Sequence, residues 1–231
     1  MSFDLSLVAS SLPLIASGIW ITLKLLVLSS VMGMILAVGI LLLRISGRWY
    51  LAWPAMAYIY FLRGTPILVQ IFIIYYGLPQ FEFVRNSIFW PLLREPFGCC
   101  FLALSLNSSA YVSEILRGGV LGVDRGVNEA AKALCLSTRQ RFVHVVAPIA
   151  IRISLPAYGN EFISMMKATA LASTVTLMDI TGVARTIVAK TFAPYEVFIA
   201  AALIYLIMAW VFQTGFGKLE QATGRYLKKE S

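Results

Sequence analysis

The sequence has few charged residues, one histidine and three cysteines. Asp, Glu, Lys and Arg make up 13% of the 231 residues and hydrophobic residues 59%, a composition far from that of a soluble domain. His144 stands alone, and Cys99, Cys100 and Cys135 lack paired metal-ligand spacing, which disfavours a metal site or a histidine proton relay. A P-loop (Gly, four residues, then Gly-Lys-Ser or Gly-Lys-Thr) is also missing, which excludes ATP binding of that type by this chain.

Long apolar runs dominate what is present. Residues 19–43 carry a single charge, Lys24, and at ~1.5 Å per helical residue they are long enough for a hydrocarbon core of ~30 Å. Similar runs lie at about 62–77, 97–116, 158–177 and 197–217. Only helices and closed barrels satisfy their backbone in lipid, and these runs are too long for barrel strands. The sequence therefore predicts an all-α polytopic membrane protein, a single domain of residues 1–231 with five transmembrane helices.

Prolines and aromatic residues give the expected boundaries of two spans. Pro54 and the pair Thr65–Pro66 predict that the second span begins near Arg63, which would anchor it at the inner interface. The aromatic-rich segment 46–60 would then rest at the cytoplasmic membrane surface. Pro148 and Pro156 are expected to bracket the approach to the fourth span.

Basic residues gather on one side of the predicted membrane. Most of the 19 Lys and Arg fall in the loops after the first and third spans and in the tail with Arg225, Lys228 and Lys229. This bias predicts an external, periplasmic N-terminus and a cytoplasmic C-terminus. It also accounts for the net charge of +8 without nucleic acid, because the charges flank spans. No Lys or Arg precedes Lys24, so the first run lacks the n-region of a cleaved signal peptide.

The longest predicted cytoplasmic loop, residues 117–155, contains a short amphipathic segment. Val127, Ala130, Ala131 and Leu134 follow the i, i+3, i+4, i+7 pattern of a helix. A helix this short is marginal alone in water, and its alanines let another surface approach the backbone closely. We therefore expect it to lie in a cleft of a soluble partner.

This segment resembles the cytoplasmic signature of the membrane permease subunits of ABC importers, in the branch that imports histidine, glutamine and other polar amino acids. That signature is Glu-Ala-Ala, three residues, Gly, nine residues, Ile, one residue and Leu-Pro. Four positions match it: Glu129, Ala130, Ala131 and Pro148. Three positions depart from it: Cys135 replaces the glycine, Val145 the isoleucine and Ala147 the leucine.

Further segments resemble the same branch, and together the resemblance covers about residues 15–220. They are Phe-Leu-Arg-Gly-Thr-Pro at 61–66 with Gln70, Tyr-Tyr-Gly-Leu-Pro at 75–79, Ala-Leu-Ser-Leu-Asn-Ser at 103–108, Gly-Asn-Glu-Phe at 159–162 and Lys-Ala-Thr-Ala-Leu-Ala-Ser at 167–173. The resemblance implies a type I ABC importer permease, a binding-protein-dependent transport system inner-membrane component of a bacterium. Such a subunit is not an enzyme and binds no cofactor.

The resemblance also implies partners. The Glu129–Cys135 helix would lie in a groove of a cytoplasmic ABC ATPase dimer, which holds ATP and Mg²⁺. A periplasmic substrate-binding protein would deliver the substrate. A second permease subunit, a sister chain or another copy, would complete the pore within the membrane lipids.

Polar residues within the spans are candidates for the substrate pathway. They form three stripes: Asn107, Tyr111 and Glu114; Asn160, Ser164 and Lys167, with Glu161 beside them; and Thr169 with Ser173. Lys167 could meet a substrate carboxylate, and Glu114 or Glu161 an ammonium or guanidinium group. The alternative is structural: these groups pair with one another or with helix ends, and the hydroxyls bind between helices.

The sequence thus predicts a permease subunit for a polar amino acid, and the overall resemblance points to a basic amino acid or an opine such as octopine or nopaline. One alternative is a self-sufficient secondary amino acid transporter with Lys167 and Glu161 as a relay, although such folds usually carry more spans and inverted repeats. A membrane scaffold, which would tolerate substitution of Lys167 and Asn107, is another. A membrane enzyme is least favoured, since no nucleophile–base or metal constellation is found.

Overall fold

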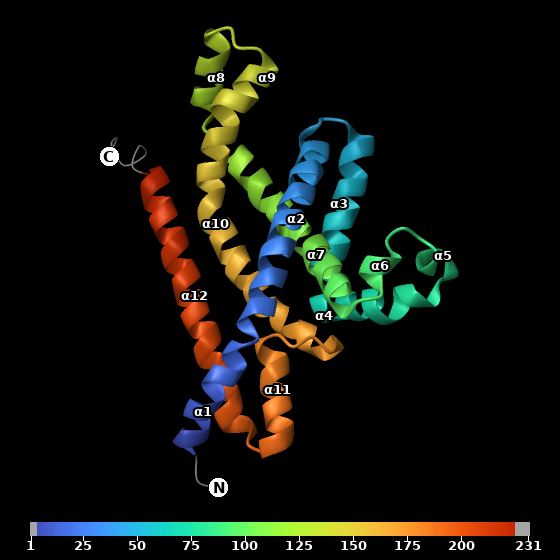
Figure 1. Ribbon diagram of the computed structural model, residues 1–231. Coiled ribbons are helices and arrows are strands. Elements are labelled where there is room, and N and C mark those ends of the chain that lie inside the picture. The colour runs from blue at the N-terminus through green and yellow to red at the C-terminus, as the bar shows by residue number, and fades with distance from the viewer. Residues whose placement is uncertain (1–3, 225–231) are drawn as a thin grey trace.

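The computed structural model describes residues 4–224, which fold into helices joined by short turns, with no strand in this range (Figure 1). The α-helices are α1 (Leu5–Ala16), α2 (Ile19–Ile45), α3 (Trp49–Gly64), α4 (Ile67–Phe72), α5 (Glu82–Arg85), α6 (Trp90–Leu93), α7 (Pro96–Leu121), α8 (Arg125–Ala133), α9 (Thr138–Arg141), α10 (Ala147–Ala168), α11 (Ile180–Thr191) and α12 (Pro194–Gly224). Two π-helical turns, Ile73–Gly77 and Phe142–Val146, and two 3₁₀ segments, Leu78–Gln80 and Thr169–Val175, complete them.

Several helical runs are long and apolar enough to cross a membrane. In the described part of the chain there are four such runs: Ile19–Ile45, Pro96–Leu121, Thr138–Val175 and Pro194–Thr223. A fifth span results if α3 and the bent segment after it are counted together. The prediction of an all-α polytopic protein is confirmed. The basic tail residues Arg225, Lys228 and Lys229 lie outside the described residues.

The second span differs from the sequence prediction. The chain is already helical from Trp49, runs through Pro54 as α3 and bends by 103° between Gly64 and Ile67. Pro54 lies inside α3 and removes one helical N–H without ending the helix, whereas Pro66 lacks the N–H that would continue the helix and forces Thr65 into an extended conformation. Arg63 therefore lies in the last turn of α3, at the end of that helix away from the α2–α3 turn.

The fourth span also begins earlier than its hydropathy indicated. A continuous helical run of 38 residues extends from Thr138 to Val175, with Pro148 and Pro156 inside it. Pro148 is the second residue of α10 and follows the π-helical turn Phe142–Val146, where the backbone hydrogen bonds already depart from the α-helical pattern. The two prolines therefore do not interrupt the run, and α10 projects beyond its apolar part.

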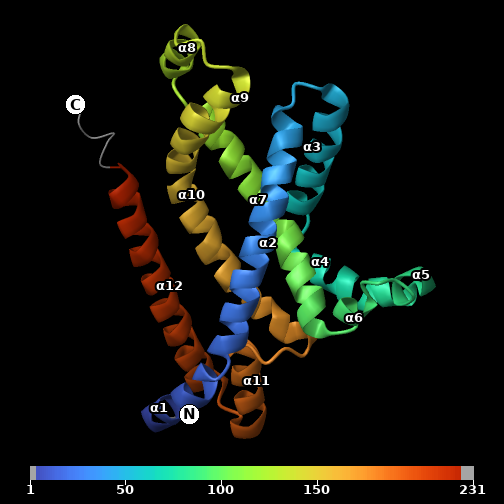
Figure 2. The same cartoon turned by 45° about the horizontal axis from the view of Figure 1, so that its top comes forward.

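The helices are arranged around α2 and α7, which cross at the centre of the molecule (Figures 1 and 2). Small residues allow this contact: a Cβ on Gly33 of α2 would lie 3.1 Å from the Ser108 side chain of α7. The α2–α3 turn, α8 and α9 lie at one end of the molecule, and α1 and α11 lie at the opposite end, as both views show.

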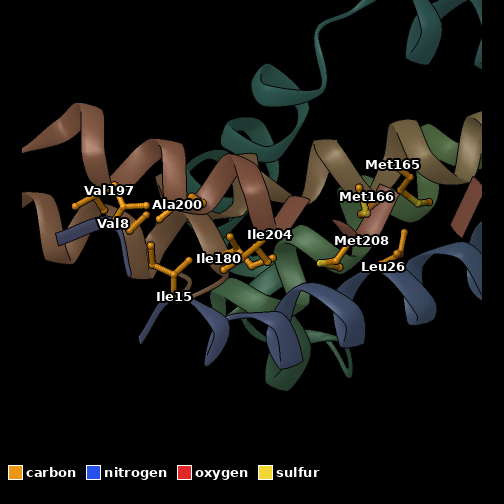
Figure 3. Packing of buried hydrophobic residues seen from close by; sticks show 12 residues of the cluster. Val8, Ile15, Leu26, Met165, Met166, Ile180, Val197, Ala200, Ile204 and Met208 are labelled. Carbon is orange, nitrogen blue, oxygen red and sulfur yellow. The ribbon is translucent and has the colours of Figure 1, made fainter. Parts of the chain in front are cut away.

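An apolar cluster joins α1, α2, α10, α11 and α12 (Figure 3). Ile15 from α1, Leu26 from α2 and Met166 from α10 are fully buried within it, together with Ile180 and Val197. Asp4 starts α1 by accepting a hydrogen bond from the Ser6 N–H at 2.8 Å. The cluster holds α1 and α11 against the adjoining parts of α2, α10 and α12.

Two adjacent glycines near the end of α7 provide a test of how closely α7 and α10 pack. A Cβ on Gly119 would lie 2.5 Å from the Ala150 carbonyl oxygen and would also strike Ser154, whereas Gly118 has open space around it. We expect Gly119→Ala to lower the stability of the detergent-solubilised chain by about 1–3 kcal/mol, the usual cost of overpacking. Thermal unfolding measures the effect, and Gly118→Ala, the matched control, should leave the midpoint unchanged or slightly higher.

Candidate functional site

A cavity of about 320 Å³ lies between α7 and α10. Four of the predicted pathway residues line it, from both helices: Asn107, Tyr111, Glu161 and Ser164. The remaining lining residues are Leu104, Ser108, Met165 and Ala168. Residues 107 and 111 are one turn apart on α7, and 161 and 164 one turn apart on α10. The two helices thus present a carboxylate, an amide and hydroxyls to one space.

Arg63 lies beside this cavity and adds a positive charge. Its guanidinium carbon is 4.9 Å from the centroid of the Tyr111 ring. The guanidinium also acts electrostatically on the Glu161 carboxylate, although the two form no salt bridge within the described residues. Glu161 therefore keeps its carboxylate available to a ligand. An anionic and a cationic group near one cavity can accept a molecule that carries both charges.

Glu114, the third residue of the α7 stripe, is already paired. Its carboxylate receives hydrogen bonds from Arg117 at 2.8 Å and from Arg44 of α2 at 3.3 Å. These two guanidinium groups already pair with the carboxylate, which the sequence analysis had considered as a partner for a cationic group of the substrate. The structure therefore places Glu114 in an ion-pair network between α2 and α7, outside the cavity lining.

Asn160 and Lys167 face away from the α7 cavity. Lys167 lines a groove of about 570 Å³ between α10 and α12, together with Tyr205 and Gln213. Asn160 lines an adjoining groove of about 290 Å³ with Gln213 and Glu220. Lys167 makes no salt bridge among the described residues. The predicted stripe on α10 is thus divided, because a helix turns residues 161 and 164 towards α7 and residues 160 and 167 towards α12.

Thr169 and Ser173 use their hydroxyls within their own 3₁₀ segment. Thr169 donates to the Met166 carbonyl oxygen at 2.6 Å, and Ser173 donates to that of Ala170 at 2.8 Å. Neither residue lines the cavity. Their hydroxyls satisfy local backbone acceptors, which is the structural alternative considered for them.

The amphipathic segment of the aqueous loop is the helix α8, which protrudes at one end of the molecule (Figure 1). Asp124 caps its start by accepting from the Gly126 N–H at 2.6 Å. Of the predicted apolar stripe, Ala131 is 4% exposed, whereas Leu134 is 75% exposed. Glu129 and Ala130 are exposed, and Pro148 lies in the first turn of α10. Most of the α8 surface is therefore open to another molecule.

Cys135 ends α8 in a conformation that favours glycine. Its φ is +55°, the Cys135 N–H donates to the Lys132 carbonyl and the Leu136 N–H donates to the Ala131 carbonyl. This pair of bonds is a Schellman motif, in which the residue after the helix is left-handed. A side chain there costs roughly 1–2 kcal/mol.

Cys135→Gly should therefore stabilise the end of α8 by about 1 kcal/mol. Hydrogen exchange of the α8 amides in the detergent-solubilised chain should slow by about fivefold, the equivalent of that free energy. Cys135→Ala removes the thiol but keeps the Cβ, so it should show no such gain. Equal exchange rates in the glycine and alanine variants would contradict the explanation.

Arg63 and Gln70 contact residues that line the cavity, Tyr111 and Asn107, although the sequence analysis placed neither of them beside it. Pro66 within an apolar run was the signal that could have located them, because a helix broken inside a membrane must satisfy its freed backbone groups on protein. Gln70 is 6% exposed and bonded to Leu62 and Thr65. Interpreting the break as a span boundary placed Arg63 at the start of the second span, whereas it lies in the last turn of α3, just before the bend.

Comparisons with known proteins agree with this architecture. Residues 29–225 match the family described as binding-protein-dependent transport system inner membrane component. The chain is 46% identical over 222 residues to the octopine transport system permease protein OccM of Rhizobium radiobacter, covering 96% of this chain and 91% of that protein. It is 39% identical over 216 residues to the histidine/lysine/arginine/ornithine transport system permease protein HisM of Escherichia coli strain K12, with 93% and 91% covered. A chain from the crystal structure of an amino acid ABC transporter with histidines superposes with a TM-score of 0.85 at 37% identity, covering 96% of this chain and all of that one.

Proposed function

Since the chain belongs to the family of binding-protein-dependent transport system inner membrane components, we propose that it forms part of the pore of an ATP-driven importer for a basic amino acid or an opine. The observation that carries the substrate class is the cavity between α7 and α10, with the Glu161 carboxylate inside it and the Arg63 guanidinium at its edge. The names of the relatives, octopine and histidine/lysine/arginine/ornithine permeases, support the same class.

The chemistry of the cavity fits a molecule with a carboxylate and a separate cationic group. Arg63 can pair with the carboxylate in a bidentate manner, and Glu161 can accept hydrogen bonds from a guanidinium or ammonium group. Tyr111, Asn107 and Ser164 add donors and acceptors that orient the bound molecule. An opine keeps the basic side chain of its parent amino acid and carries an additional carboxylate, so the same two charges serve both classes.

The exposed helix α8 is the proposed contact with the ATPase dimer. Its open surface, with Glu129 and Ala130, is presented at the end of the molecule that also carries the α2–α3 turn, whereas Ala131 is buried. Arg44 and Arg48 lie at that turn, and positive charge marks the cytoplasmic side. This orientation puts the described start of the chain, at α1, on the periplasmic side and α8 in the cytoplasm. ATP and Mg²⁺ bind the ATPase in this scheme, and this chain binds no cofactor.

A second permease subunit is the proposed neighbour of the exposed polar face of α10. Asn160 and Lys167 are exposed on this membrane-embedded helix, in the grooves beside α12. Ionisable groups within a bilayer are costly unless they pair or face water. Another copy of this chain or a sister chain, together with the water-filled pathway between the two, would remove that cost.

The secondary-transporter alternative predicts uptake without an ATPase. Uptake of a labelled substrate by the purified protein, measured with and without ATP and with unlabelled competitors, distinguishes an ATP-driven importer from a secondary transporter. The importer is purified from its own host in mild detergent with its partners, reconstituted in proteoliposomes and supplied with labelled L-arginine, its binding protein and ATP. We expect arginine uptake to require ATP and to be inhibited by unlabelled octopine and arginine but not by glutamate. Uptake by this chain alone without ATP would support the alternative, and a lack of competition by every basic amino acid and opine would reject the substrate class.

A further inference from the structure

The break between α3 and α4 is held together by two side-chain amides. Gln70 Nε2 donates to the carbonyl oxygen of Leu62 at 2.8 Å, to that of Thr65 at 3.1 Å and to Thr65 Oγ1 at 2.8 Å. Asn107 Nδ2, from α7, donates to the same Leu62 oxygen at 3.2 Å and to Gln70 Oε1 at 3.1 Å. The amide of Gln70, on α4, thus bonds back across the break to the end of α3 and also accepts from Asn107, which lines the cavity.

The sequence of the break explains why it needs these donors. In an uninterrupted helix, the Leu62 carbonyl would accept from the N–H four residues later, but that residue is Pro66, which has no N–H. Water cannot replace the missing donor at a site where Gln70 is 6% exposed. Gln70 and Asn107 supply the donors instead, so the 103° bend leaves no buried acceptor unsatisfied at Leu62.

Arg63 lies between the two residues that are held in this way. Leu62 precedes it and Thr65 follows Gly64, and a Cβ at Gly64 would meet nothing within 4 Å. Arg63 belongs to the last turn of α3, which ends at Gly64 just before the break. The Gln70 hydrogen bonds to Leu62 and Thr65 hold this last turn on either side of Arg63, whose guanidinium lies 4.9 Å from the Tyr111 ring at the edge of the cavity.

We propose that Gln70 is a positioning residue of the transport site: its side-chain amide replaces the missing Pro66 N–H and thereby fixes Arg63 where the guanidinium meets the substrate carboxylate. This proposal rests on the proposed substrate site between α7 and α10. Gln70 contacts no substrate in this scheme and acts through Arg63.

The first test is a kinetic comparison in the reconstituted importer, with labelled L-arginine as the probe. Gln70→Met keeps the length of the side chain and removes its hydrogen bonds. We expect it to raise the KM for arginine at least fivefold while kcat changes less than twofold. The matched control is Gln80→Met, because Gln80 is exposed and donates only to the Tyr76 carbonyl at 3.1 Å. This control should leave KM unchanged.

A double mutant distinguishes positioning from a general structural role. Arg63→Gln alone should raise KM at least tenfold. If Gln70 acts through Arg63, adding Gln70→Met to Arg63→Gln should raise KM by less than a further twofold. An equal multiplication of KM by Gln70→Met in both backgrounds would overturn the proposal, as would an unchanged KM in the single variant.

A labelling experiment tests the geometry without any substrate. Arg63→Cys is introduced with Cys135→Ser, since Cys135 is exposed and Cys99 and Cys100 are buried. The rate of modification by a cationic methanethiosulfonate reagent should change at least threefold on adding Gln70→Met or Gln70→Glu and should not change on adding Gln80→Met. Equal rates in all of these variants would reject the positioning role even if the substrate site is correct. Conversely, an unchanged KM for arginine in Glu161→Gln would reject the substrate site while the labelling rates still decide the role of Gln70.

Discussion

Glu129→Lys should reduce ATP-driven arginine uptake by the assembled importer at least 100-fold. Glu129 is exposed on α8, whose surface is the proposed contact with the ATPase. Like charges brought together at an interface cost several kcal/mol, and each 1.4 kcal/mol is about a tenfold change in the equilibrium constant. The measurement is uptake in proteoliposomes together with the amount of ATPase that copurifies with this chain.

A charge reversal on α5, at the side of the molecule and away from α8, is the matched control for this prediction (Figure 1). Glu82 is exposed on α5 and makes only a long contact of 3.9 Å with Arg85. Glu82→Lys should leave the copurified ATPase at the level of the unmodified chain. An importer with Glu129→Lys that retains both its ATPase and full uptake would show that α8 is not the coupling contact.

Glu161→Gln should raise the KM for L-arginine about 10- to 100-fold. The substitution keeps the size of the side chain and removes its charge, so the expected loss is that of a charge-assisted hydrogen bond, about 1.5–3 kcal/mol. The effect should be smaller for L-glutamine, which has no cationic side chain. Initial uptake rates at several concentrations of each amino acid measure the ratio between the two.

Glu220→Gln serves as the control for this second prediction. Glu220 lines the groove between α10 and α12 with Asn160, away from the α7 cavity. The same change of charge at that position should not alter the ratio of the KM values for arginine and glutamine. If Glu161→Gln raises both KM values equally, Glu161 does not bind the cationic side chain of arginine, and the role proposed for its carboxylate is wrong.

The long apolar runs determined the fold class from the sequence alone, because a chain in lipid must satisfy every backbone group within helices. The first and third spans follow directly from this rule, since residues 19–43 and 97–116 lie within α2 and α7. The formation of the amphipathic helix also depends on residues that are close together in the sequence. Its apolar spacing and the Asp124 cap act within a few residues, so a helix forms in the predicted segment; it spans Arg125–Ala133, starting before Glu129 and ending before Cys135.

The candidate site was only partly predictable. Spacing along one helix shows which side chains share a face, but it cannot say which neighbouring helix that face meets. Asn107, Tyr111, Glu161 and Ser164 were named from spacing and do line one cavity. Glu114 looked equivalent to Tyr111 in the sequence, and its pairing with Arg44 depends on how α2 crosses α7.

Tertiary structure alone decided the role of the broken second span. A proline in an apolar run can end a membrane helix or bend it within the membrane, and the two outcomes have the same local sequence. What selects the bend here is a pair of amide donors, Gln70 eight residues beyond Leu62 and Asn107 on another helix, which replace the missing Pro66 N–H. The sequence determined which residues are apolar, basic and helical. The packing of α7 against the break determined that Arg63 lies beside a cavity, because only a folded chain brings those donors to the Leu62 carbonyl.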